Sequence, residues 1–129
     1  MIEGNLERMS FVAGQDFTSA HQYHAVNIDS TDTTDTAIAV ELAGAGENAV
    51  GFLETYDTTG NDVSVIVNGQ CKAVAGAAIT VNAPLKVTAA SRLTPCTANN
   101  DVGVAYALTA ASADGEILLI QIARFYYGA

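Results

Sequence analysis

Two histidines, His21 and His24, are the residues whose type and spacing most directly suggest chemistry. Separated by three positions, they could present two metal ligands from one helical turn. A zinc site needs a third and a fourth ligand, and nothing in the sequence marks them. We interpret both histidines as polar residues at the edge of the first strand of the domain, and we expect neither a metal nor another cofactor.

A second pattern, Asp29, Asp32 and Asp35, places a carboxylate at every third residue. Acidic calcium loops also concentrate carboxylates, but an EF-hand alternates its ligands and needs a central Gly and a closing Glu. Neither feature accompanies these aspartates. We therefore interpret residues 29–36 as a solvated loop.

The glycines Gly44, Gly46 and Gly51 resemble a phosphate-binding loop only superficially. The third Gly of GxGxxG would come two residues earlier, at position 49, and would open a helix. The sequence also lacks a GxSxG elbow, a Walker loop and an HExxH motif. A pair of carboxylates could still act as a glycosidase dyad, but nothing positions one. We expect the chain not to be an enzyme.

Short apolar segments separated by turn signals make up most of the chain, which is typical of a β-barrel or β-sandwich. Pro84 suits the first position of a strand, where no ladder donor is needed. Helix is expected only as one short piece, within 18–23 or within 105–113. The strands are expected at 23–28, 37–42, 50–53, 63–67, 70–75, 85–88, 93–97, 102–104 and 117–122.

One β-turn-β pattern occurs twice. Residues 50–53 lead through a polar turn to 63–67, and residues 102–104 lead through Asp114-Gly115 to 117–122. Matching Gly51 with Gly103 makes the second copy two residues longer, since Gly51 to Val63 is 12 positions and Gly103 to Ile117 is 14. The pattern predicts a small domain built from two related halves. Asn68-Gly69 is the strongest hairpin signal and predicts a turn between 63–67 and 70–75.

The composition limits the partners. With 129 residues the chain is long enough for one domain with its own core. Charged residues are only 15%, which favours a surface hidden in an assembly over a compact Ala-rich monomer. A net charge of −9 disfavours nucleic acid and anionic membranes. No signal peptide or membrane span is recognisable, and Cys71 and Cys96 are expected to be reduced, partly buried thiols.

The two ends of the chain are the candidate contact segments. We predict residues 1–16 to be an arm that docks on a partner through Ile2, Leu6, Met9 and Phe11, with a frayed terminus as the alternative. Residues 17–129 would form the single β-rich domain. Near its end, Phe125, Tyr126 and Tyr127 either anchor an interface or close the core.

Three segments, AGAGENAVGFL, NGQCKAVAGAAIT and NDVGVAYALTAASADGEILLIQI, resemble the capsid cement, or head decoration, proteins of tailed bacteriophages. The resemblance covers about residues 23–122; the DSTDTTDT loop and the RFYYGA tail do not match. It implies a small β-rich domain of β-tulip or β-clip type, often a trimer, without catalytic residues. Such proteins bind the outer surface of the expanded capsid and connect neighbouring major capsid proteins.

The physical properties agree with that role. A protein that binds only the assembled lattice stabilises it by mass action, and an acidic chain suits the outer surface of a capsid filled with DNA. The chain would be made in the host cytoplasm and reside on the virion. The alternative is a carbohydrate- or receptor-binding surface module, with Tyr106 or Tyr56 as the stacking residue.

Overall fold

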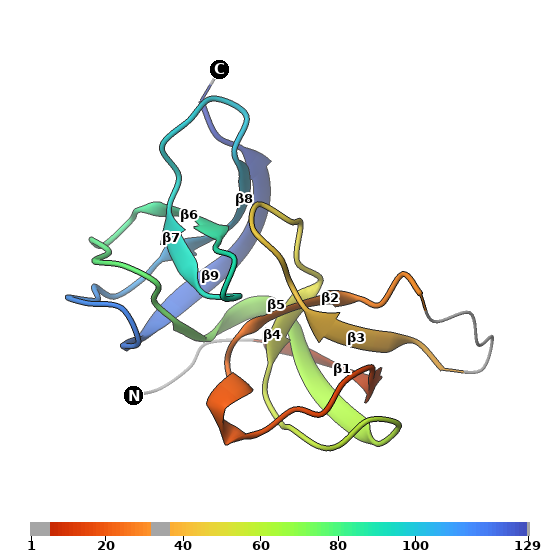
Figure 1. Ribbon diagram of the computed structural model, residues 1–129. Coiled ribbons are helices and arrows are strands. Elements are labelled where there is room, and N and C mark those ends of the chain that lie inside the picture. The colour runs from red at the N-terminus through yellow and green to blue at the C-terminus, as the bar shows by residue number, and fades with distance from the viewer. Residues whose placement is uncertain (1–5, 32–36, 129) are drawn as a thin grey trace.

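A computed structural model describes residues 6–31 and 37–128, and these residues form a single mainly-β domain (Figure 1). Nine strands belong to one continuous sheet, and a single turn of 3-10 helix, η1 (Ser19–His21), lies in the predicted segment 18–23. The strands are β1 (Leu6–Ala13), β2 (Ala25–Ile28), β3 (Ala39–Leu42), β4 (Gly51–Leu53), β5 (Asp62–Val74), β6 (Pro84–Val87), β7 (Leu93–Pro95), β8 (Val102–Ala107) and β9 (Ile117–Tyr126).

The first half of the chain forms a closed ring of five strands in the order β1-β3-β2-β4-β5, which we call ring 1. Its strand pairs are antiparallel except for β1 and β3, which run parallel. An antiparallel ladder between β1 and β5, from Leu6 opposite Gly69 to Val12 opposite Asp62, closes the ring. Closure removes most of the open strand edges that a small flat sheet would expose.

The second half forms another ring, ring 2, in the order β5-β9-β8-β6-β7. Its strands pair antiparallel, and a parallel bridge between Ala75 and Leu93 joins the end of β5 to β7. The long strand β5 therefore belongs to both rings and passes from one to the other (Figure 1).

The two rings have the same topology. Ring 2 repeats the strand order and the directions of ring 1, with the second part of β5 in the place of β1. Backbone hydrogen bonds repeat as well: Gly60 N–H donates to Ala13 O at 2.9 Å, and Gly115 N–H donates to Ala75 O at 2.8 Å. Both glycines have a φ near +90°, which favours glycine. The predicted duplication is confirmed.

The predicted register between the halves is wrong by two residues. Gly51 pairs with Val26 in ring 1, and the residue paired in the same way with Leu85 in ring 2 is Ala105, not Gly103. Gly103 lies beside an irregularity in the β8–β9 ladder. Gly51 lies against the backbone of Ile66, whereas Gly103 lies under the Phe125 ring. The two glycines are therefore not equivalent, and matching them by residue type shifted the alignment of the two halves.

The predicted hairpin at Asn68-Gly69 is also wrong, because β5 runs without interruption from Asp62 to Val74. Gly69 has a φ of 88°, the left-handed conformation that an Asn-Gly turn also uses. In this protein Gly69 is the last residue of β5 that pairs with β1, and from Gln70 onward β5 pairs with β9. Asn68-Gly69 therefore marks the point where the partner of β5 changes from β1 to β9.

Each ring has an apolar interior. The core of ring 2 also includes residues on the outer face of ring 1. Ring 1 encloses eight buried residues: Phe11, Ala13, Phe17, Val26, Val40, Leu53, Val63 and Val65. Their equivalents by register and backbone pairing lie in the larger core cluster: Ala73, Ala75, Ile79, Leu85, Leu93, Ala107, Leu118 and Ile120. That cluster also contains Phe52 and Ile66 from ring 1, so one core joins the two rings.

Two of the expected strands are confirmed by the structure. The expected strand starting at Pro84 is β6, and the expected apolar strand over 117–122 is part of β9. Of the predicted arm, residues 6–13 form β1 of the sheet, and residues 1–5 lie outside the described part, as does most of the 29–36 loop. Cys71 and Cys96 are both buried, and they are not joined in a disulfide. No helix among the described residues is long and apolar enough to cross a membrane.

Candidate interaction surfaces

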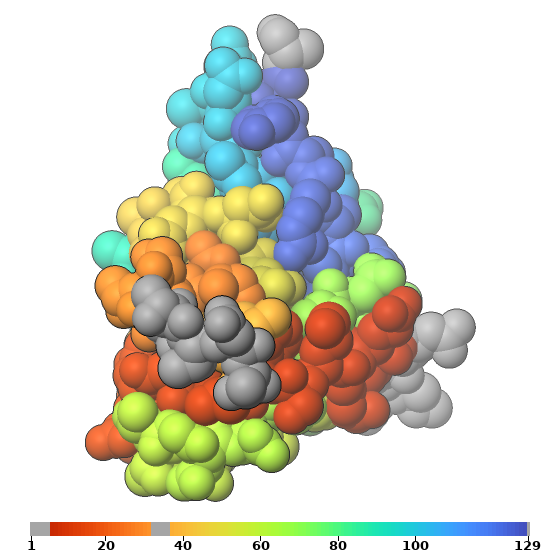
Figure 2. Space-filling model, turned by 90° about the vertical axis from the view of Figure 1, so that its right-hand side faces the viewer, coloured from red at the N-terminus to blue at the C-terminus, as the bar shows by residue number. Residues whose placement is uncertain are grey.

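The predicted N-terminal contact residues differ in accessibility. Met9 is exposed on β1, Leu6 is half-buried against the large core cluster, and Phe11 is buried inside ring 1. Ile2 lies outside the described residues. Figure 2 shows β1 along the surface of ring 1 (red). Only Met9 of the described three therefore offers a large apolar surface to a partner, and its role as a contact stays a prediction.

A shallow groove follows the outer side of β1. Its volume is about 430 Å³. Exposed apolar atoms come from Met9 on one side and Ile38 on the other. The lining residues are Met9, Ser10, Phe11, Val12, Ala37, Ile38 and Asp62.

The C-terminal aromatic residues differ in accessibility, and an interface role for any of them stays a prediction. Phe125 stacks on Tyr106 with 4.6 Å between ring centroids and covers Gly103, where an added Cβ would lie about 2.1 Å from the Phe125 ring. Tyr127 is half-buried and its N–H donates to Asp101 O. Tyr126, in contrast, is 75% exposed. Phe125 thus packs on the sheet, and Tyr126 is available to a partner.

Arg124 connects the end of β9 to ring 1. One guanidinium nitrogen, Nη2, donates to the carbonyl oxygens of Ala49 at 2.5 Å and Val50 at 3.0 Å. These bonds link the end of β9 to the segment that precedes β4. Beside them lies a groove of about 230 Å³, lined by Asn48, Val102, Gly103, Arg124, Phe125 and Tyr126.

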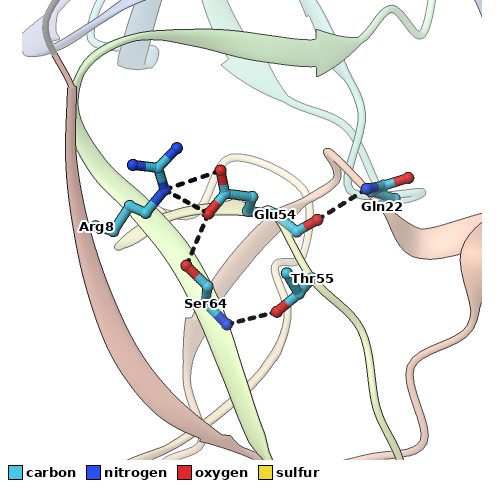
Figure 3. Close-up of polar contacts among 5 residues, drawn as sticks. All are labelled: Arg8, Gln22, Glu54, Thr55 and Ser64. Carbon is cyan, nitrogen blue, oxygen red and sulfur yellow. Dashed lines mark hydrogen bonds and ion pairs between the residues drawn. The ribbon is translucent and has the colours of Figure 1, made fainter.

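A charged network crosses the outer face of ring 1 (Figure 3). Arg8 Nε donates to both carboxylate oxygens of Glu54, at 2.7 and 2.9 Å, and Ser64 Oγ donates to the same carboxylate at 2.8 Å. Gln22 Nε2 donates to the backbone oxygen of Glu54. The hydrogen bond from Arg8 is the main cause that lowers the pKa of Glu54, with Ser64 adding to it against the effect of burial.

Glu54 therefore stays ionised over the ordinary pH range and ties β1 to β4 and β5. Because the Arg8–Glu54 ion pair is partly exposed, it contributes little to the stability of the fold, and its main effect is to fix the position of β1 relative to β4.

Each basic residue in the chain is already engaged. Three form ion pairs: Arg8 with Glu54, Lys86 with Asp101 and Arg92 with Asp114. Lys72 Nζ lies 5.6 Å from the centre of the Tyr23 ring, and Arg124 binds the two carbonyls.

Charge is distributed unevenly between the rings. Residues 1–69 hold 11 of the 14 acidic residues and one of the five basic residues, a net charge of −10. Residues 70–129 hold three acidic and four basic residues, a net charge of +1. Ring 1 is the source of the acidic character of the whole chain.

The histidines do not form a metal site. His21 Nδ1 accepts the N–H of Thr18 at 3.0 Å and so caps η1. His24 is buried, and its Nε2 accepts Arg92 Nε at 3.4 Å while its Nδ1 lies 3.3 Å from Gln22 O. Within residues 6–31 and 37–128, no three His, Cys, Asp or Glu side chains are grouped to hold a metal ion.

Burial is the main cause that lowers the pKa of His24, and the positive charge of Arg92 acts in the same direction. A hydrogen bond to the Gln22 carbonyl opposes the shift. His24 is consequently neutral at neutral pH.

The architecture has a counterpart among solved structures. The crystal structure of the N base of the head fiber protein gp8.5 from bacteriophage phi29 matches with a TM-score of 0.71 and 16% sequence identity. The match covers 97% of this chain and 100% of the phi29 chain. The fold resembles that of a phage head fiber base. No protein-family model and no curated protein matches the sequence.

The resemblance to phage head proteins predicted from the sequence is thus confirmed at the level of the fold. The Arg8–Glu54 network and the Arg124 bonds were not predicted, because their partners are 46 and about 75 positions apart in the chain. The charge difference between the halves could have been read from the sequence.

Proposed function

We propose that this chain is a structural protein of a bacteriophage virion, which binds the outer surface of the assembled capsid and bridges copies of the major capsid protein. The observation that carries the proposal is the fold shared with the phi29 head fiber base over nearly the whole of both chains. That protein is part of a phage head, as its name states. We also propose that three copies of the chain associate into a homotrimer.

The chemistry of the surface supports a structural role. Within residues 6–31 and 37–128, no three His, Cys, Asp or Glu side chains are grouped to hold a metal ion, and each Lys and Arg side chain has a partner within the chain. An acidic protein is repelled by DNA inside the capsid and is favoured on its outside. Binding that requires the assembled lattice stabilises the lattice by mass action, and several weak contacts per oligomer add through effective concentration.

The direct test measures binding to purified expanded capsids and to free major capsid protein. We expect saturable binding to capsids, weak binding to the free subunit and an increase in the temperature at which capsids open. Tyr126→Ser removes an exposed aromatic ring without disturbing the core, and Tyr56→Ser is the matched control in ring 1. Equal binding to capsids and to free subunits would contradict lattice recognition.

A second candidate is carbohydrate binding, which one observation favours. Tyr106 is an exposed aromatic residue held flat against Phe125, and such rings stack on sugars. A glycan array probed with the wild type and with Tyr106→Ala tests this function. Binding that the substitution abolishes would support it, and the absence of any bound glycan would reject it.

A further inference from the structure

Ring 2 carries apolar residues at the positions where ring 1 carries its charged network. The strand registers place Leu119 where ring 1 has Ser64, and Leu108 where ring 1 has Glu54. Backbone bonds confirm the correspondence: Glu54 N–H donates to Ser64 O at 2.9 Å, and Leu108 N–H donates to Leu119 O at 2.8 Å. A carboxylate and a hydroxyl in one ring are leucines in the other.

A third position shows the same replacement. Tyr23 and Asn82 are equivalent, since both have a positive φ, 66° and 71°, and both donate their N–H to the last residue of a strand, β4 or β8. The residues before them are Gln22 in ring 1 and Val81 in ring 2. Gln22 hydrogen-bonds to the backbone of the network, whereas a valine cannot.

A fourth position lies at the start of the last strand of each ring. Asp62 is opposite Val12 in ring 1, and Ile117 is opposite Val74 in ring 2. An exposed carboxylate in ring 1 is therefore an exposed isoleucine in ring 2.

The four ring 2 residues, Val81, Leu108, Ile117 and Leu119, form what we call the apolar patch. Val81 is 52% exposed, Leu108 37% and Ile117 51%, whereas Leu119 is nearly buried beneath them. Because the same fold accepts polar residues at all four equivalent positions in ring 1, the ring does not need apolar side chains there in order to fold. Exposed apolar surface without a folding role is typical of protein interfaces.

We propose that the apolar patch binds a second copy of this chain, with ring 2 against ring 2. The difference in net charge between the two rings favours contact through ring 2 over contact through ring 1. Ring 2 has a net charge of +1 over residues 70–129, so two such rings approach without strong repulsion. Residues 1–69 carry −10, and contacts through ring 2 leave the acidic rings on the outside of the oligomer, away from one another.

The inference deepens the proposed function, because it rests on the proposed self-association and assigns a surface to it. Ring 2 would lie at the centre of the oligomer. Ring 1 would lie at its periphery, where its acidic surface faces other partners. Identical patches of this kind can meet where copies of the chain surround a shared symmetry axis.

The experiment replaces patch residues by those that ring 1 already carries. Val81→Gln, Leu108→Glu and Ile117→Asp are combined in one variant of the full chain, and Tyr56→Ser is a control that removes an exposed aromatic ring from ring 1. Sedimentation equilibrium gives the association constant. Circular dichroism and thermal melting establish that each variant is folded.

We expect the wild type and Tyr56→Ser to self-associate equally, and the triple variant to be folded with self-association weakened at least about tenfold. A wild type that stays monomeric at all concentrations, or a folded triple variant that associates as well as the wild type, overturns the inference. If the triple variant does not fold, Val81→Gln alone gives the same comparison.

Occupancy on purified capsids is measured in parallel. A wild-type chain that is monomeric but binds capsids overturns the patch assignment and leaves the capsid function standing. Loss of capsid binding by Val81→Gln without any change in self-association assigns the patch to the capsid and also overturns the inference.

Discussion

Asp101 holds the loop between β7 and β8 through three hydrogen bonds to one carboxylate oxygen. Oδ2 accepts the N–H groups of Thr97 and Ala98 at 3.0 and 2.9 Å and Lys86 Nζ at 3.0 Å. The backbone donors, followed by Lys86, lower the pKa of Asp101 to about 2. Ring 1 uses Glu47 in the corresponding loop, where it accepts the N–H of Gly44 at 2.8 Å.

Replacing Asp101 should therefore change the stability of the protein in acid. Because the pKa of Asp101 in the folded protein lies below the ordinary 3.8, its contribution is complete above about pH 4 and is lost as the pH falls toward 2. Asp101→Asn should lower the melting temperature at neutral pH and flatten its dependence between pH 4 and 2. Calorimetry across that range is the measurement, with Asp62→Asn, which removes an exposed carboxylate, as control.

His24 should affect stability at higher pH. Its pKa in the folded protein lies below the ordinary 6.5, so the unfolded chain binds the proton first. The contribution of neutral His24 is complete above about pH 6.5 and is lost as the pH falls through the lowered pKa. His24→Gln should flatten the dependence of unfolding free energy on pH below pH 7, measured by urea titration.

At the scale of elements, β5 leaves no room for a side chain at Gly51 of β4. An added Cβ would lie 2.3 Å from the backbone oxygen of Ile66 and 2.7 Å from a methyl group of Val65. Since the obstacle is backbone, relaxation would have to separate β4 from β5. Gly51→Ala should destabilise the protein by about 1–3 kcal/mol.

The matched control is Gly44→Ala, where the nearest atom is the flexible carboxylate of Glu47 at 3.3 Å. Chemical denaturation of both variants gives the comparison. Equal stability of the two would mean that β4 and β5 are not in the described register.

The sequence determines strands well and their partners poorly. The nearly unbroken apolar run 117–122 and the Asp114-Gly115 turn identified β9 and its pairing with β8, because both signals are local. The dipeptide Asn68-Gly69 gave a wrong prediction of a hairpin, because a glycine with positive φ can lie within a strand as well as in a turn. The Arg8–Glu54 network depends on ring closure, which joins residues 46 positions apart and leaves no local pattern.

At the scale of the whole molecule, the two rings should unfold together. They share β5, and one core cluster includes both Phe52 of ring 1 and Leu118 of ring 2. Neither ring can therefore open without exposing apolar surface of the other. Calorimetry should show one transition whose calorimetric and van't Hoff enthalpies agree, and Ile120→Asp in ring 2 should abolish folding of both rings.

The isolated halves give the complementary experiment. A fragment ending at Gly69 keeps the strands of ring 1 but exposes Phe52 and Ile66, and we expect it to be unfolded or aggregated. A fragment that folds with the stability of the intact chain would show that the rings are independent.

The uninterrupted course of β5 also has a mechanical consequence. When a pull separates ring 1 from ring 2, tension passes along the covalent backbone of β5, which is hydrogen-bonded to β1 and β4 in one ring and to β9 in the other. Strands that slide along one another must break many such bonds at once, whereas strands that peel apart break them singly. The join between the rings is therefore a continuous strand that is hydrogen-bonded within both rings.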